Sequence, residues 1–394
     1  MVLRKVIIFA KNLLIMKSSR YFLIAIVVIL LLPLAGHLIW RAQKKNPMDL
    51  MIVNKTVPRS AENEVKTLNW VLNYEKVLKD GNDNYDFSRD YYGFHPDALS
   101  ADRSIKAFRL EDLPELCDKY DGLIYLDNEG VELENQKYAS LKYYGGFNNT
   151  DYHLLKEMIN SDKLVIVEYN FFSEPTEDLI RFNTEQLMDI YSLQWKGKYF
   201  KNLAANKVFK EIDKKWLNAH NDYYENEWDY NGPGLVLCNL KQNRVVILPS
   251  EEYLNDQPTI KTGKQMSETY NLPEEVSFTG WFNIVHEGEN EVISRLDLNL
   301  NDDGVEYLKK NGLEASFPVS VKMQDKPVFF LAGDFSKQKV FLPSSKMRIV
   351  NDVYRSICKN MTGNPGLFFQ TYYLPLMSGI ISTHINNKSE GEES

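Results

Sequence analysis

The stretch KLVIVEYNFFSEPT, residues 163–176, constrains the fold more than any other part of the chain. Its apolar run Leu164–Val167 is too short for an independent helix, and such a run is typical of a strand covered on both faces in the middle of a parallel sheet. The polar residues Glu168 and Asn170 follow at once, and a helical pattern begins a few residues later. This order predicts side chains in the crevice at the carboxyl edge of an open α/β sheet.

Short apolar runs and helical patterns alternate on both sides of this stretch. We expect further strands at residues 49–54 and 122–127, and helices at 61–78, 151–159 and from 177, the last capped by Ser173 or Thr176. Residues 232–239 and 244–248 predict a hairpin at a sheet edge. The alternation predicts a doubly wound, mostly parallel α/β domain over residues 46–256.

The C-terminal part is richer in strand patterns. Residues 257–385 fit either a second domain or a continuation of the first sheet. The apolar run 367–377 (LFFQTYYLPLM) is too short to cross a bilayer, so we expect it to pack on the core. Residues 386–394 are polar and predict a disordered tail.

The N-terminal segment Tyr21–Trp40 carries no formal charge. Its length corresponds to about 30 Å of helix, which matches one hydrocarbon thickness. Five basic residues precede it, so we expect residues 1–20 in the cytoplasm, an uncleaved helix in the inner membrane at 21–40, and the remainder outside. A cleaved signal peptide is the alternative, but the apolar region is long and no A-x-A site follows it.

Composition narrows the range of partners. Residues 41–394 hold 41 basic residues (46 in the chain less five before residue 21) against 54 acidic ones, a net charge of −13. This balance argues against nucleic acid and against anionic lipid headgroups. The chain has only three cysteines, Cys117, Cys238 and Cys358, which are too few for a disulfide framework, although one disulfide is compatible with an extracytoplasmic location.

Motifs for common cofactors are absent from the sequence. There is no glycine-rich phosphate loop, no G-x-G-x-x-G and no G-x-S-x-G elbow. The six histidines are scattered without an H-E-x-x-H or H-x-H pair, so we expect neither a cofactor nor a metal site.

Three carboxylates are the candidate catalytic residues. Asp127 and Glu168 each end a predicted strand, and Asp334 follows the apolar run FFLAG in the same way. If these strand ends converge, two carboxylates can act as acid and base or hold the hydroxyls of a ligand. The structural alternative is that Asp127 and Glu168 cap helices or accept hydrogen bonds from loop amides.

Five other residues are candidate ligand contacts. Tyr144, Gly145 and Gly146 precede the central strand, where glycine allows the backbone to approach a ligand, although such a sequence is also an ordinary turn. Asn170 lies at the strand tip, and Trp195 belongs to the segment QWKGKYF. Aromatic residues suit sugar stacking as well as core packing.

The serial order of several motifs resembles a known family. IVNKTVP, YYGGF, VEYNFFSEPT, QWKGKYF, FTGWF, FPV, FLAGDF and FFQTYYLPLM follow one another between Asp49 and Met377. They resemble membrane-anchored bacterial proteins whose extracytoplasmic part is similar to class I glutamine amidotransferases, a flavodoxin-like fold. An active glutaminase needs a cysteine at the strand-to-helix elbow, activated by histidine and an acid. Here the elbow is Glu168-Tyr169-Asn170, so the resemblance implies the fold without that reaction.

Two functions remain open from the sequence. The first is a tethered, non-catalytic amidotransferase-like protein that binds an envelope glycan or a partner protein. The alternative is a carboxylate-dependent hydrolase of an envelope polysaccharide, using Glu168 with Asp127 or Asp334. We expect the first, because strand-end carboxylates more often serve structure than turnover.

Overall fold

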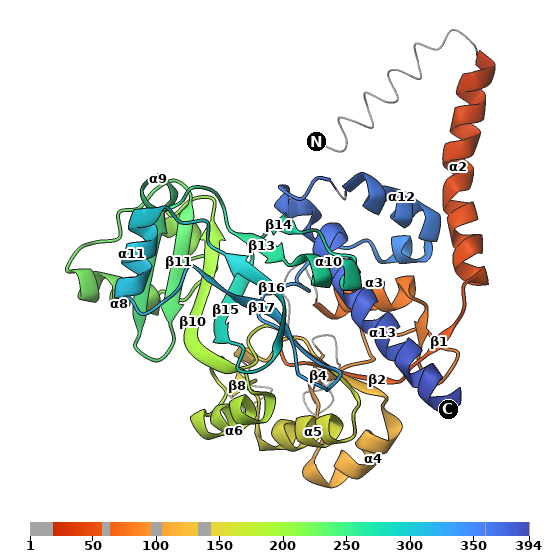
Figure 1. Cartoon of the computed structure of the whole chain (residues 1–394), viewed down its shortest axis with the longest axis horizontal. Helices are drawn as coiled ribbons and strands as arrows, with labels where there is room; N and C mark the ends of the chain where they lie inside the picture. The colour runs from red at the N-terminus through yellow and green to blue at the C-terminus, as the bar shows by residue number, and fades with distance from the viewer. Residues whose placement is uncertain (1–18, 57–63, 96–104, 133–142, 359, 394) are drawn as a thin grey trace.

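The computed structural model describes residues 19–56, 64–95, 105–132, 143–358 and 360–393. Two sheets organise these residues, one of ten strands and one of four. Helices cover both faces of the larger sheet (Figure 1). The predicted α/β class is confirmed.

The centre of the ten-stranded sheet is parallel. Its strands lie in the order β18-β9-β6-β2-β4. The strand β9 (Leu164–Val167) is the predicted central strand, and all four of its residues are fully buried. The bounds of the other four strands are Val328–Leu331 for β18, Gly122–Tyr125 for β6, Leu50–Asn54 for β2 and Tyr92–Phe94 for β4.

Antiparallel strands extend this centre on both sides. At one edge β5 (Ile105–Lys106) pairs with β4, and on the other side β17, β16, β13 and β14 follow β18. These four strands span Ser316–Lys322, Glu291–Asp297, Thr259–Thr262 and Glu275–Ser277. Most strands of the C-terminal part therefore continue the first sheet, and the predicted boundary at residues 256 and 257 does not separate two sheets. The sheet as a whole is mixed, with its parallel part confined to the centre.

Alternate residues of the central strands enter two different cores. Leu164 and Ile166 belong to the same core as residues of helix α3 (Glu64–Tyr74), while Val165 and Val167 share a core with α5 (Asn149–Asn160) on the opposite face. The face covered by α5 is also covered by α4 (Leu113–Lys119) and α6 (Asp178–Met188). The face covered by α3 is also covered by α10 (Lys264–Tyr270) and α13 (Leu374–Glu393). Covering on both faces explains the unbroken aliphatic run of β9.

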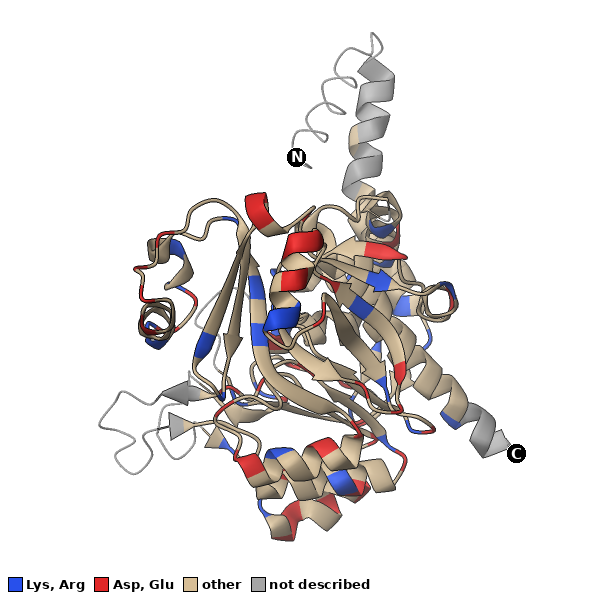
Figure 2. Ribbon diagram, turned by 60° about the vertical axis from the view of Figure 1, so that its left-hand side comes forward, with Lys and Arg blue, Asp and Glu red and all other residues tan. Residues whose placement is uncertain are grey.

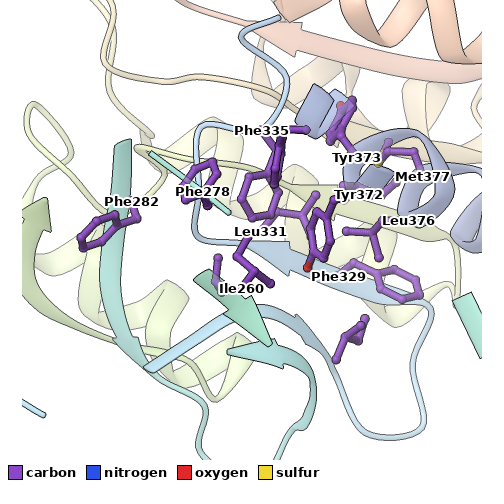
Figure 3. Packing of buried hydrophobic residues seen from close by; sticks show 14 of the residues in the cluster. Ile260, Phe278, Phe282, Phe329, Leu331, Phe335, Tyr372, Tyr373, Leu376 and Met377 are labelled. Carbon is purple, nitrogen blue, oxygen red and sulfur yellow. The ribbon is translucent and has the colours of Figure 1, made fainter. Parts of the chain in front are cut away.

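The C-terminal apolar run packs on the core, as predicted. Tyr372 lies beside Leu331 and Phe329 of the sheet, and Leu376 lies beside Phe329 (Figure 3). A π-helical turn, Phe369–Tyr373, precedes α13. The helix then continues to Glu393, so the described part of the segment predicted as a disordered tail is helical, and Lys388 holds it to Asp121 by an ion pair of 2.8 Å.

The second sheet is antiparallel, in the order β12-β11-β10-β15. It contains the predicted edge hairpin, β11 (Gly234–Asn239) with β12 (Arg244–Pro249). The long β10 (Tyr191–Phe200) joins it to β15 (Trp281–His286). The sheet packs on α8 (Lys215–Tyr224) and the short α7 (Ala205–Val208). The helices α9 (Ser250–Tyr253) and α11 (Asp302–Lys310) contact each other. Two short strand pairs lie outside both sheets. They are β1 (Asn46–Pro47) with β3 (Val77–Leu78), and β7 (Val131–Glu132) with β8 (Tyr143–Tyr144).

The N-terminal helix α2 (Ser19–Ala42) contains the predicted helical segment 21–40 and projects from the body of the protein (Figure 1). Its lower end is held by Trp40, whose indole N–H donates to the carbonyl oxygen of Asn73 at 2.6 Å. It also packs against α12 (Arg348–Cys358). A helix with the length and apolarity needed to cross a bilayer is not found within the described residues. The predicted cytoplasmic N-terminus, residues 1–20, lies almost entirely outside them.

Candidate functional site

The central strand ends in a buried carboxyl group. Glu168 continues the parallel pairing of β9, since its N–H donates to the carbonyl oxygen of Tyr125 at 2.8 Å. Only 1% of the residue is exposed. The hydroxyl of Tyr373 donates to Glu168 Oε1 at 2.7 Å, while Oε2 has no hydrogen-bond partner among the described residues. Burial raises the pKa of Glu168 to about 8, against the opposing hydrogen bonds from Ser336 and Tyr373.

The neighbouring strand β6 ends at a second buried carboxyl group, Asp127. Its Oδ1 accepts hydrogen bonds from the backbone N–H of Glu129 at 2.8 Å and from Asn170 Nδ2 at 3.3 Å. Burial, followed by the charge of Glu129, raises the pKa of Asp127 to about 7. Asn170 itself has a left-handed backbone with φ of 65°, a conformation that asparagine tolerates better than most residues.

Asp334 lies where the two sheets meet. It follows β18, and its N–H donates to the carbonyl oxygen of Trp281 in β15 at 2.8 Å. The strands β6, β9 and β18 are parallel neighbours, so the ends that carry Asp127, Glu168 and Asp334 lie at one edge of the sheet. The charge of Asp334 adds to burial in raising the pKa values of Asp127 and Glu168. The predicted convergence of the three strand ends is thus seen in the structure.

Two members of this group are missing from the sequence-based prediction. Glu64, in the first turn of α3, is buried, and burial followed by the charges of Asp334 and Asp127 raises its pKa to about 8. Lys337 forms an ion pair with Asp334 at 3.7 Å. Burial alone lowers the pKa of Lys337, but the charges of Asp334, Glu64 and Asp127 outweigh burial and raise it. An acidic residue in the first turn of the helix after β2 was the available signal for Glu64.

A buried ion pair stabilises the rim beside the carboxyl cluster. Lys55, directly after β2, pairs with Asp151 in the first turn of α5 and donates to the carbonyl oxygen of Gly146 at 2.8 Å. Tyr125 donates to the same aspartate at 3.0 Å. Lys55 and Asp151 are at most 5% exposed. This pair orders the loop before α5.

A cavity of about 570 Å³ opens next to the carboxyl cluster. Asp334 and Lys337 belong to its wall, together with the end of β10 and the loop between β14 and β15. Its other lining residues combine hydroxyl and amide groups with aromatic rings and lysines; they are Lys198, Tyr199, Phe200, Lys201, Asn202, Lys207, Lys210, Glu211, Ser277, Phe278, Thr279, Gly280, Trp281, Gln338, Pro365 and Phe368. Elsewhere charges of both signs are spread over helices and loops (Figure 2).

The cavity reaches only one of the three predicted carboxylates. Asp334 lines it, whereas Asp127 and Glu168 do not. Asp127 accepts a hydrogen bond from a loop amide, as the structural alternative expects, whereas Glu168 accepts one from the hydroxyl of Tyr373, which is neither a helix cap nor a loop amide.

The five predicted ligand contacts lie outside this cavity. Trp195 is 5% exposed and belongs to the core beneath the second sheet. Gly146 has a φ of 76° and contacts Pro175, so it serves a tight turn; Gly145 and Tyr144 precede it in the same loop. Asn170 is buried and holds Asp127. The expected capping of α6 by Ser173 or Thr176 is also wrong, because Glu177 is the N-cap residue and Thr176 Oγ1 accepts from the N–H of Phe147 at 2.9 Å.

No activated thiol lies at the elbow in the described part of the chain. All three cysteines are free. Cys238 on β11 shares an apolar cluster with Tyr169 of the elbow, and burial raises the pKa of its thiol to about 12. A catalytic cysteine requires the opposite shift, toward the thiolate. Across the described residues, no three His, Cys, Asp or Glu side chains are grouped closely enough to hold a metal ion.

Comparison with known proteins yields only distant similarities to solved structures. No family model matches the chain, and no curated protein matches it. A ThuA-like protein from Bacteroides uniformis aligns with 82% of this chain and 98% of its own at 11% identity and a TM-score of 0.33. A beta-galactosidase from Bacillus circulans sp. alkalophilus aligns with 81% of this chain and 32% of its own at 10% identity and a TM-score of 0.32. Similarities this weak carry no functional argument.

Proposed function

We propose that the protein is a membrane-tethered binding protein of the bacterial cell envelope that holds a glycan in the cavity beside Asp334 without cleaving it. The observation that carries this proposal is the position of the cavity relative to the carboxyl cluster. The cavity lies at the carboxyl edge of the parallel strands, where α/β folds bind ligands, but only Asp334 of the three strand-end acids lines it.

The lining of the cavity suits a polyhydroxylated ligand. Asn202, Ser277, Thr279 and Gln338 offer hydrogen-bonding groups, and Tyr199 offers an aromatic surface. A few polar groups placed among aromatic side chains are typical of small-molecule sites. The volume of about 570 Å³ is within the usual range for such pockets.

Apolar surface on two adjacent helices supports the tether. Leu34 and Leu38 of α2 are 55% and 54% exposed, and the sequence around them carries no charge from Tyr21 to Trp40. On the neighbouring α12, Val353 and Ile357 are 54% and 63% exposed and lie one helical turn apart. Such surface is unfavourable in water and favourable in a bilayer. We propose that the domain that follows α2 lies on the extracytoplasmic side of the inner membrane.

Binding is tested by presenting full-length protein, purified in detergent, to an array of neutral and acidic bacterial glycans. Thr279→Trp fills the cavity from its wall and is expected to abolish binding. Thr150→Trp, at a half-buried helix start that does not line the cavity, is the matched control and retains binding. Binding that survives Thr279→Trp, or no binding to any glycan, would refute the proposal.

The tether is tested by fractionating cells. The full chain is expected in the membrane pellet after washing with high salt and with carbonate, and a chain starting at Lys44 in the soluble fraction. Recovery of the full chain in the soluble fraction would contradict the membrane tether. It would not bear on the proposed glycan-binding site.

A carboxylate-dependent hydrolase is the second candidate, and one observation favours it. With a pKa of about 8, Glu168 is protonated at neutral pH and is able to donate a proton. This function requires a substrate to reach Glu168 through the wall of the cavity. It predicts that a glycan is cleaved by the wild-type protein and not by Glu168→Gln, while Glu251→Gln on an exposed helix remains active.

A further inference from the structure

The charge of the cavity points to the class of its ligand. Five lysines and two acidic residues line it, a local excess of positive charge. The whole chain, by contrast, has a net charge of −8. We infer that the cavity binds an anionic glycan, one that carries carboxylate or phosphate groups, and this inference rests on the proposed glycan-binding function.

Two of the five lysines are already neutralised within the protein. Lys198 forms an ion pair with Glu211, and Lys337 forms one with Asp334 at 3.7 Å. Lys198 also lies over the rings of Phe200 and Trp281 at 5.4 and 5.7 Å from their centroids. These two lysines are positioned by their partners and belong to the scaffold of the wall.

The other three lysines have no such partners. Lys201, Lys207 and Lys210 are exposed, and no ion pair to any of them is found within the described residues. All three come from one segment: Lys201 directly follows β10, Lys207 lies in the short α7, and Lys210 follows that helix by two residues. Three uncompensated ammonium groups at one side of a cavity create a positive field that attracts an anionic ligand and discriminates against a neutral one.

An anionic ligand also fits the rest of the lining. The hydroxyl and amide groups of Ser277, Thr279 and Asn202 suit sugar hydroxyls, and the lysines supply the counter-charge for acidic substituents. Lysine recognises carboxylate and phosphate as a point charge on a flexible stem, so the rim accommodates more than one acidic group and geometry.

The test compares matched charged and neutral probes. Full-length protein is titrated with oligogalacturonate, with its neutral methyl ester, with a glycerol-phosphate oligomer and with inorganic phosphate alone. We expect one of the two acidic oligomers to bind at least about tenfold more tightly than the methyl ester, and to weaken as salt rises. Comparison of the two acidic oligomers shows whether the cavity prefers a ligand with carboxylate groups or one with phosphate groups. Inorganic phosphate shows whether a negative charge is sufficient for binding without the rest of the oligomer.

Variants assign the effect to the three lysines. Changing Lys201, Lys207 and Lys210 together to glutamine is expected to weaken binding of the acidic oligomer about tenfold and to flatten its salt dependence. A triple glutamine variant of the exposed Lys241, Lys264 and Lys309, which do not line the cavity, changes the net charge equally and is expected to bind normally.

The outcomes separate this inference from the proposed function. If oligogalacturonate and its methyl ester bind equally tightly, and the triple lysine variant does not change this, the inference of an anionic ligand is wrong, while the proposal of a glycan site stands. An equal effect of both triple variants also overturns it, because the attraction then comes from net charge. If no glycan of the array or of this series binds, both proposals fail.

Discussion

Replacing Glu168 by glutamine is expected to flatten the dependence of the unfolding free energy on pH. In the folded protein the pKa of Glu168 is about 8, against an ordinary value of 4.5. The folded state therefore keeps a proton that the unfolded chain releases above pH 4.5. The stability contributed by this proton is complete below pH 4.5, and it is lost as the pH rises toward 8.

The magnitude follows from the size of the shift. Between pH 5 and 7.5 the unfolded chain gains from ionisation of this carboxyl group while the folded state does not, a difference of about 3 kcal/mol. Glutamine does not ionise, so the free-energy difference between the variant and the wild type changes by about this amount over the same range. Glu168→Gln thus becomes more favourable relative to wild type as the pH rises.

The assay is urea denaturation at half-unit steps from pH 5 to 7.5, followed by tryptophan fluorescence. Glu251→Gln, on an exposed helix, is the control and is expected to follow the wild-type curve. Parallel curves for Glu168→Gln and wild type would refute the buried, protonated state of Glu168.

Three further predictions follow from the contacts around the strand ends. Lys55→Met leaves the carboxylate of Asp151 buried without its cation, which is expected to cost about 3–5 kcal/mol in urea denaturation; a loss below about 1 kcal/mol would contradict the ion pair. Tyr373→Phe removes a hydrogen bond that lowers the pKa of Glu168, so the pH-dependent loss of stability is expected to extend to higher pH, with a cost of about 1 kcal/mol. The buried thiol of Cys238 is expected to react with iodoacetamide about a hundredfold more slowly in the folded protein than in urea, measured by mass spectrometry; equal rates would contradict the burial of this thiol.

The sequence predicts the centre of the fold because the pattern there has one physical explanation. An unbroken aliphatic run such as Leu164–Val167 needs apolar cover on both faces, and parallel strands bring their carboxyl ends to one edge. Those two facts are enough to bring Asp127, Glu168 and Asp334 together. These two facts do not predict which of the three carboxylates lines a cavity.

The parts missed by the sequence depend on packing between distant segments. Trp195 lies in a strand whose alternation does not show which face the second sheet covers, so a core residue was predicted to be a ligand contact. Glu64 and Lys337 approach the strand ends from a helix and a loop, and no spacing links them to Asp334. Lys201, Lys207 and Lys210 look like an ordinary solvated surface in the sequence, and only the structure shows that all three line a cavity.

Binding without turnover is tested most directly by calorimetric titration of the full chain with the tightest glycan from the array, followed by mass spectrometry of the same sample after prolonged incubation. We predict a saturable heat, lost in Thr279→Trp, with the glycan recovered intact. Cleaved glycan whose formation depends on Glu168 would contradict this account.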